Sequence, residues 1–309
     1  MDLLALVRTL PRKDSSSYEN QAWPRERLGS QETQPTFSVL RDQVLSFGKR
    51  RSAWVSVKRQ KLQGLVGARH RGGRQAWEID YLIDGCENGG VVAGLLTQAV
   101  QAAGEAGAEK VFLRLESDSA LLIPAREAGF FPYQEETLYV LNRPLAAEAV
   151  ECRTATPADS YPLFRLYTAS TPEPVRRHEA VTYAEWQAGM ERRWMRGGIE
   201  VVAERDGVPR AHVRASQWTQ GTLFELRLAA DAVPETLGLL SATMLTLDAG
   251  TPAGPMLALV PSQDEGVARR LEDAGFLAAG DYVSLVHRTT RPLTLPKAVP
   301  AVAKNAVGV

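Results

Sequence analysis

The sequence predicts an α/β fold made of two similar domains, each a mixed, mostly antiparallel sheet flanked by helices. Short segments with alternating apolar residues predict strands, and longer segments with helical spacing follow the later strands. The order of these segments occurs twice, at an offset of about 146 residues. A duplicated domain is therefore the simplest reading of the 309-residue chain.

The repeat is carried by seven pairs of short motifs in the same order. Glu-Ala-Gly-Phe at 127–130 matches Asp-Ala-Gly-Phe at 273–276, and Glu78-Ile79 matches Glu225-Leu226. We therefore expect one domain at residues 1–145 and a second at 146–295. Residues 296–309 contain small residues, two prolines and little charge, and we expect a flexible tail there.

The elements of the first half follow from periodicity. We expect helices at 91–106 and 119–128, each stopped by a glycine. The polar stretch 15–35 is either an irregular helix or a loop over a pocket. The expected strands are 4–9, 53–58, 62–69, 76–83, 110–115 and 137–141.

The second half shows clearer boundaries. Thr156-Pro157 begins a helix, with Thr156 as its N-cap and Asp159 favourable in the first turn. Asp206-Gly207 predicts a tight hairpin turn. Further helices are expected at 183–196, 234–247 and 264–274. The expected strands are 151–154, 199–204, 211–217, 222–228, 256–260 and 282–287.

The amino-acid composition narrows the range of functions that the protein could have. Lys and Arg total 36 and Asp and Glu total 36, so no overall attraction to nucleic acid or to a membrane surface is predicted. Two cysteines cannot form a disulfide framework, and no signal or membrane-spanning segment stands out. A soluble cytoplasmic protein without a membrane partner is expected. The four histidines lack metal-ligand spacing, so no metal is expected.

Residues 49–74 are strongly basic and contain no Asp or Glu. This stretch could steer an anionic cofactor or acceptor, or contact nucleic-acid phosphates. It could equally be the solvated face of a hairpin whose lysines protect a sheet edge. Because Trp54 is its only Trp, Tyr or Phe residue, stacking on bases is poorly supported and a nucleic-acid partner is not favoured.

The first half resembles the GNAT acyl-CoA N-acyltransferases between Ala53 and Leu141. The resemblance rests on the strand Trp77-Glu-Ile-Asp-Tyr-Leu-Ile83, the turn Asn88-Gly89-Gly90, a helix with Leu95-Leu96, and the ending Ala128-Gly129-Phe130. The second half resembles the family more weakly, mostly through Ala274-Gly275-Phe276. The resemblance implies that coenzyme A lies between two parted strands, with its diphosphate on backbone N–H groups at the start of the next helix.

On this basis acetyl-CoA, as co-substrate, is expected in the first half. Glu87 and Val92 depart from the family pattern, which has Arg or Gln and then Gly or Ala at these positions. The glycines could instead form an ordinary turn, and Asp118 could be a helix N-cap. The expected cofactor-binding residues are Tyr81, Leu82, Ile83, Asn88, Gly89, Gly90, Val91, Val92 and Asp118.

A general base must take a proton from the incoming amine. Glu78 and Asp80 are the candidates, because alternation places them on one face of their strand, opposite Trp77, Ile79 and Tyr81. They could instead be solvated or paired with arginines. The family often has a tyrosine in the following helix to protonate the departing thiolate. That position is Ala125 here, so Tyr133 is the expected catalytic acid, with Tyr139 or water as alternatives.

In the second half, the corresponding turn contains Asp231, Pro234 and Glu235 but no glycine. We expect this half to be structural, or to form a wall of the acceptor site. The predicted function is transfer of an acetyl group to a primary amine of a small molecule or peptide, by direct attack. The alternative is a catalytically inactive GNAT-like binding or scaffolding protein. The sequence indicates neither the acceptor nor the oligomeric state.

Overall fold

The computed structural model describes residues 19–29, 51–59, 61–71, 75–86, 89–189, 198–218, 221–247 and 254–289. The expected strand at 4–9 and the tail at 296–309 lie outside these residues, as do Glu87 and Asn88. The first half contains η1 (Arg25–Arg27), β1 (Arg51–Lys58), β2 (Lys61–His70), β3 (Ala76–Asp84), α3 (Gly89–Glu105), β4 (Lys110–Glu116), α4 (Leu122–Glu127) and β5 (Phe131–Leu141).

The second half begins with β6 (Arg153–Thr154) and three helices, and then repeats the order of the first half. Its elements are η2 (Pro157–Asp159), α5 (Ser160–Ser170), α6 (Glu173–Glu179), α7 (Tyr183–Gly189), β7 (Ile199–Arg205), β8 (Val208–Trp218), β9 (Gly221–Leu228), η3 (Ala230–Glu235), α8 (Thr236–Thr246), β10 (Met256–Pro261), α9 (Glu265–Asp273) and β11 (Leu277–Arg288). The predicted α/β fold is confirmed.

Local sequence signals account for several boundaries. Asp159 accepts hydrogen bonds from the backbone N–H of Thr156 at 2.7 Å and from its hydroxyl at 2.8 Å, as expected for a capped helix start. Asp206 and Gly207 have φ values of 54° and 73°, so both central residues of the β7–β8 turn are left-handed, as a tight hairpin of this type requires.

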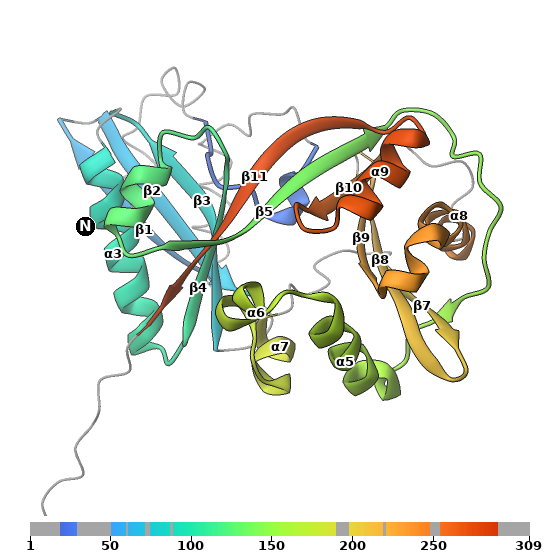
Figure 1. Cartoon of the computed structure of the whole chain (residues 1–309). Helices are drawn as coiled ribbons and strands as arrows, with labels where there is room; N and C mark the ends of the chain where they lie inside the picture. The colour runs from blue at the N-terminus through green and yellow to red at the C-terminus, as the bar shows by residue number, and fades with distance from the viewer. Residues whose placement is uncertain are drawn as a thin grey trace, which may run out of the picture.

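All the described strands form one continuous sheet of 11 strands, in the order β1-β2-β3-β4-β11-β5-β10-β9-β8-β7-β6. The two halves exchange their last strands. β11 pairs with β4 of the first half, and β5 pairs with β10 of the second half. β5 and β11 also pair with each other, and they cross the middle of the molecule side by side (Figure 1).

Helices cover the sheet on both faces. α3 and α4 bury Val92, Leu96 and Ala125 in a core with β2, β3 and β4. α8 and α9 bury Leu239 and Leu271 in an equivalent core on β7 to β10. α5 and α7 lie on the opposite face of the second half, in a separate cluster. No helix in the described ranges is long and apolar enough to cross a membrane.

A buried polar network holds the exchanged strands together. Arg114 of β4 donates to Glu136 of β5 at 2.9 Å, and Ser284 of β11 donates to the same carboxylate oxygen at 2.7 Å. Gln134 donates to the other oxygen of Glu136 at 3.1 Å. The carboxylate therefore has charged and neutral donors from three strands, which offset the cost of burying it.

Candidate functional site

The first half has the parted strands that the resemblance predicts. β3 and β4 run parallel and pair only from Ala76 to Glu78, opposite Lys110 to Phe112. Beyond this point the chain itself fills the space between them, with an inserted segment that we define as residues 19–29. The N–H of Gln21 donates to the carbonyl of Leu82 at 2.7 Å, and the N–H of Trp23 donates to the carbonyl of Arg114 at 2.9 Å. The segment thus bridges β3 and β4.

Asn20 completes this insertion. Its side-chain oxygen accepts from the N–H groups of Leu82 and Ala22, each at 2.9 Å, and its amide nitrogen donates to the carbonyl of Asp80 at 3.1 Å. Ala22 is fully buried in the core beneath α3. Both backbone hydrogen-bonding groups of Leu82, which we expected to contact a cofactor, are therefore used within the chain.

The start of α3 also differs from a phosphate-binding turn. Val92 is fully buried in the core under α3 rather than facing a ligand. A Cβ atom on Gly89 would lie 2.5 Å from Pro124 Cγ, so this glycine allows α3 to pack closely on α4. Gly90 is exposed and Val91 is half-buried. The prediction that the first half holds acetyl-CoA does not fit this arrangement, because the chain fills the gap itself.

A substitution of Asn20 tests whether this residue holds residues 19–29 in place between β3 and β4. In Asn20→Ala the buried N–H groups of Leu82 and Ala22 lose their shared acceptor, and each loss costs about 1–3 kcal/mol. We expect urea unfolding to show a free energy of unfolding about 2–4 kcal/mol lower than that of the wild type. The exposed Asn142→Ala is the control, with a change within about 0.5 kcal/mol. Equal effects at both positions would show that Asn20 does not anchor the segment.

Glu78 and Asp80, the predicted bases, are brought together by one arginine. Arg69 Nη2 lies 2.8 Å from Glu78 Oε2, and Arg69 Nε lies 3.8 Å from Asp80 Oδ2. Both carboxylates are buried, with exposed fractions of 5% and 1%. This matches the alternative in which the carboxylates pair with arginine, and it leaves them poorly placed to take a proton from a substrate.

Around Asp80, successive side chains of β3 do not simply alternate between the two faces of the sheet. The β2–β3 register shifts there, because Gly67 pairs with Tyr81 and Ala68 pairs with Ile79. Asp80 is thus the extra residue of a β-bulge, which reverses the facing of the residues after it. Ile79 and Leu82 point into the core under α3, whereas Tyr81 and Ile83 pack on the other face. The expected grouping of Tyr81 with Ile79 is wrong for this reason.

Two further predicted residues lie apart from this bulge. Tyr133 packs beside Phe112, with ring centres 6.1 Å apart, and burial raises the pKa of its hydroxyl to about 12. Asp118 is exposed, and the N-cap position of α4 is Leu121, so neither the cofactor role nor the capping role of Asp118 has support here. The role of Tyr133 as a catalytic acid stays a prediction.

The second half keeps the opening that the first half has filled. β9 and β10 pair in parallel only as far as Glu225 and Leu259, and a cavity lies where they part. It encloses about 1070 Å³ of empty space, part of it open to solvent. Its walls come from both strand ends, the β9–α8 and β10–α9 connections, and the end of α5. The lining residues are Ala169, Ser170, Arg210, Leu226, Leu228, Ala229, Ala230, Val233, Leu259, Val260, Pro261, Gln263, Asp264, Gly266 and Val267. We call this the strand-end cavity.

The strand-end cavity presents apolar and polar surface in nearly equal measure. The Gln263 side-chain nitrogen is buried and has no hydrogen-bond partner among the described residues. Burial raises the pKa of Asp264 above its ordinary value. Arg205 and Arg210 both pair with Asp231 at the start of η3, so the negative charge of Asp231 is neutralised by arginines.

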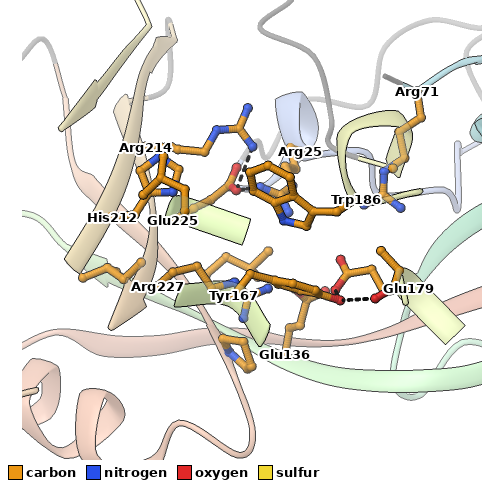
Figure 2. Close-up of a pocket in the computed structure, with 16 residues that line it drawn as sticks. Arg25, Arg71, Glu136, Tyr167, Glu179, Trp186, His212, Arg214, Glu225 and Arg227 are labelled. Atoms are coloured by element: carbon orange, nitrogen blue, oxygen red, sulfur yellow. Dashed lines mark hydrogen bonds and ion pairs between the residues drawn. The ribbon is translucent and has the colours of Figure 1, made fainter. Parts of the chain in front are cut away.

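A second cavity lies on the α5–α7 side of the sheet (Figure 2). We call it the charged cavity. Leu226, Leu259 and Pro261 line both cavities, so the two adjoin at the ends of β9 and β10. The other lining residues of the charged cavity are Arg25, Arg71, Glu136, Leu163, Tyr167, Glu179, Ala180, Trp186, Gly189, His212, Arg214, Glu225 and Arg227.

Most ionisable groups of the charged cavity have partners, which Figure 2 marks with dashed lines. Glu225 forms ion pairs with Arg25 of the inserted segment and with Arg214, the latter at 3.4 Å. Tyr167 donates its hydroxyl to Glu179 at 3.2 Å. Glu225 faces Arg214 across the β8–β9 pair just as Glu78 faces Arg69 across β2–β3. The same Arg–Glu pair thus occurs in both halves.

His212 is the group in the charged cavity with the properties of a base. Burial lowers the pKa of His212 below its ordinary value, and Glu200, 3.4 Å from Nε2, offsets this only in part. A histidine with a lowered pKa is neutral at neutral pH and can accept a proton. His212 carries no local sequence signal, because Glu200 and the other residues that line the charged cavity are brought beside it only by the fold.

The basic stretch 49–74 is not one solvated face. Lys49, Arg50 and Arg74 lie outside the described residues. Arg69 is buried against Glu78, and Arg71 is buried with its guanidinium 4.0 Å from the centre of the Phe112 ring. Arg71 also lines the charged cavity. At least two of these basic side chains, those of Arg69 and Arg71, are therefore buried in the protein interior. In the described ranges, no cluster of His, Cys, Asp or Glu side chains could hold a metal ion.

Solved structures resemble the whole chain in this arrangement. A GCN5-related N-acetyltransferase from Sphaerobacter thermophilus is 16% identical, with a TM-score of 0.50 over 92% of this chain and 98% of that one. The chain has the GNAT fold. A tandem GNAT protein from the clavulanic acid biosynthesis pathway is 13% identical, with a TM-score of 0.50 over 93% and 94% of the two chains. No family model and no curated protein sequence matches the chain.

The two halves of this GNAT fold differ at their parted strands. In the first half residues 19–29 fill the space, and in the second half a cavity remains. Sequence reasoning favoured the first half, because only its turn contains glycines. No comparable signal marks the second half, since the residues that line its cavity come from four separate segments of the chain.

Proposed function

We propose that the protein is a GNAT-type N-acyltransferase that binds acyl-CoA, with acetyl-CoA as the expected donor, in the strand-end cavity of its second half. The observation that carries the proposal is that this cavity opens where β9 and β10 part and adjoins a second, ionisable cavity. A two-substrate transfer needs two adjoining sites of this kind. The N-acetyltransferase with the same fold supports the reaction class.

The residues of the strand-end cavity fit the acyl-pantetheine arm of such a donor. Leu226, Leu228 and Val260 provide apolar walls for its carbon chain. The Gln263 amide nitrogen is a buried donor suited to an amide carbonyl of the arm. Arg210 is the nearest cation for the diphosphate, although Asp231 shares it. When bound, the donor supplies an activated acyl group at the junction of the two cavities.

The charged cavity is the proposed acceptor site. An amine attacks a thioester only as the free base, so its ammonium form must first lose a proton. His212 lines this cavity and is neutral at neutral pH, so we assign it as the proton acceptor. Glu225 is held as a carboxylate by Arg25 and Arg214, which makes it a weaker base. In the reaction the C–N bond forms, the C–S bond breaks, and the thiolate takes up a proton.

Binding and turnover test this proposal. We expect calorimetric titration to show acetyl-CoA binding, and thiol release to depend on an added amine. Because catalysis by a general base contributes about 100- to 10,000-fold, His212→Gln should lower kcat by that factor and leave the dissociation constant of acetyl-CoA unchanged. Wild-type activity should fall as the pH is lowered through a pKa below about 6.5, since protonated His212 cannot accept a proton.

His178→Gln, on α6, is the matched control and should keep both the rate and the pH profile. An unchanged rate in His212→Gln would remove the assignment of this residue as the base. Failure of the wild-type protein to bind acetyl-CoA at millimolar concentration would remove the enzymatic proposal altogether. The filled gap of the first half would then favour the alternative of a non-catalytic GNAT-like binding protein.

A further inference from the structure

Arg227 stands apart from the other charged groups of the charged cavity. The three glutamates that line this cavity each have a partner: Glu136 binds Arg114, Glu179 accepts from Tyr167, and Glu225 binds Arg25 and Arg214. Arg227 has no carboxylate within ion-pair distance among the residues that the structure describes. Its guanidinium carbon lies 5.8 Å from the centre of the Tyr167 ring, and its charge acts to lower the pKa values of His212 and Asp264.

The alternation of side chains along β9 explains why Arg227 points into the charged cavity. Phe224, Leu226 and Leu228 pack into the core beneath α8 and α9. Alternation therefore turns Glu225 and Arg227 to the opposite face, toward α5, with about 7 Å between their Cα atoms. In the first half, Tyr81 takes the register position that Arg227 has in the second half, so this cation is not part of the repeated Arg–Glu pair.

The walls around Arg227 are suited to a small organic molecule. Tyr167 of α5 and Trp186 of α7 line the same cavity, with their ring centres 6.3 Å apart. Arg227 is half-buried and lines the cavity, and Figure 2 shows its side chain beside Tyr167. Leu226, Leu259 and Pro261 line this cavity and the strand-end cavity alike, so the two adjoin there.

We infer that the charged cavity binds an acceptor that carries a carboxylate close to its amine, as an amino acid does, with Arg227 binding the carboxylate. This inference rests on the proposed acyltransferase function. A guanidinium presents paired N–H donors that match the two oxygens of a carboxylate. Four arginines and three glutamates line the cavity, which leaves one formal positive charge, and a singly charged carboxylate matches this better than a doubly charged phosphate does. Tyr167 and Trp186 then cover the carbon skeleton, and the amine points toward Leu226 and Leu259.

The test compares acceptors that differ only in this charge. The probes are the set of proteinogenic L-amino acids and the same set as C-terminal amides, each given with acetyl-CoA while thiol release is followed. We expect the acids to be used about 10- to 100-fold more efficiently, as kcat/KM, because hydrogen bonds to a charged group are worth a factor of this size. Equal use of acids and amides would overturn the inference.

Arg227→Gln locates the effect in the protein. It should lower kcat/KM for the acids by about 10- to 100-fold, mainly through KM, and leave the amides unchanged. Arg227→Lys should restore part of the loss, and the exposed Arg177→Gln should behave as the wild type. Calorimetry with acetyl-CoA should give an unchanged dissociation constant for Arg227→Gln, which also shows that the variant is folded. A loss shared by acids and amides would overturn the inference.

The two proposals fail differently. Absence of acetyl-CoA binding in the wild type would reject the acyltransferase function. The carboxylate site alone would be rejected if acetyl-CoA bound normally but the enzyme used acids and amides equally well. The same would follow if the wild type and Arg227→Gln used the acids equally well. Thermal unfolding with the amino acids alone gives a readout without turnover: the wild type should be stabilised by the acids, and Arg227→Gln should not.

Discussion

Ala230→Trp is expected to abolish acyl-CoA binding, whereas Cys86→Trp is expected to leave it intact. Ala230 begins η3 and lines the strand-end cavity, so an indole there fills the space between β9 and β10. Cys86 holds the matching place, two residues beyond the end of β3, in the half whose gap residues 19–29 already fill. We expect the dissociation constant of acetyl-CoA, measured by calorimetry, to rise about 100-fold or more for Ala230→Trp.

The pair of variants decides which half binds the donor. Ala230 is exposed at the start of its turn, so the tryptophan should be tolerated by the fold, and the thermal unfolding temperature checks this. If Cys86→Trp abolished binding and Ala230→Trp did not, the donor would bind in the first half after displacement of the inserted segment. The assignment to the second half would then be wrong.

Glu136→Ala is expected to cause the largest loss of stability. The substitution removes the acceptor of Arg114, Ser284 and Gln134 and leaves the Arg114 guanidinium buried, with its side chain only 5% exposed. Breaking a buried ion pair on one side costs about 3–5 kcal/mol. Urea unfolding should show a decrease of this size in the free energy of unfolding. The exposed neighbour Glu135→Ala is the control, with a change within about 0.5 kcal/mol.

The same network predicts a pH dependence of stability. Burial alone would raise the pKa of Glu136, but Arg114 and Arg25, with the bond from Ser284, hold it below its ordinary value. A carboxyl group whose pKa is lower in the folded protein than in the unfolded chain stabilises the fold at pH values above its unfolded-state pKa. This stabilisation is lost as the pH falls through its folded-state pKa. The wild type should therefore lose more stability than Glu136→Gln in acid below about pH 4.5. Parallel curves would show that the pair is not coupled to folding.

The two halves illustrate how one fold can diverge in function. Arg69–Glu78 and Arg214–Glu225 are the same cross-strand pair, kept in both copies. In the first half residues 19–29 take the place between β3 and β4 and make the backbone hydrogen bonds there. The same segment then reaches the second half, where Arg25 pairs with Glu225 in the charged cavity. The first half thus contributes a side chain to the charged cavity of the second half.

The sequence alone determined most of the elements and their repeated order, although the helix α6 was not predicted and β5 begins earlier than expected. Alternation in β7 to β9, the Asp206-Gly207 turn and the Thr156 cap are local signals, because each depends on residues within a few positions of one another. The same signals led to the resemblance and therefore to the GNAT fold. They also favoured the first half for the cofactor, since glycines in a turn are visible in a sequence, whereas the segment that lies between β3 and β4 is not.

Only the tertiary structure decided the exchange of β5 and β11, the bulge at Asp80 and the place of the cavities. Asn20 and Leu82 are hydrogen-bonded although 62 positions separate them in the sequence, and Ser284 and Glu136 are hydrogen-bonded across 148 positions. No local periodicity encodes such contacts, because the same pattern of apolar residues allows a strand to pair with several partners. The choice among them depends on which arrangement buries the apolar faces and satisfies every buried polar group at once.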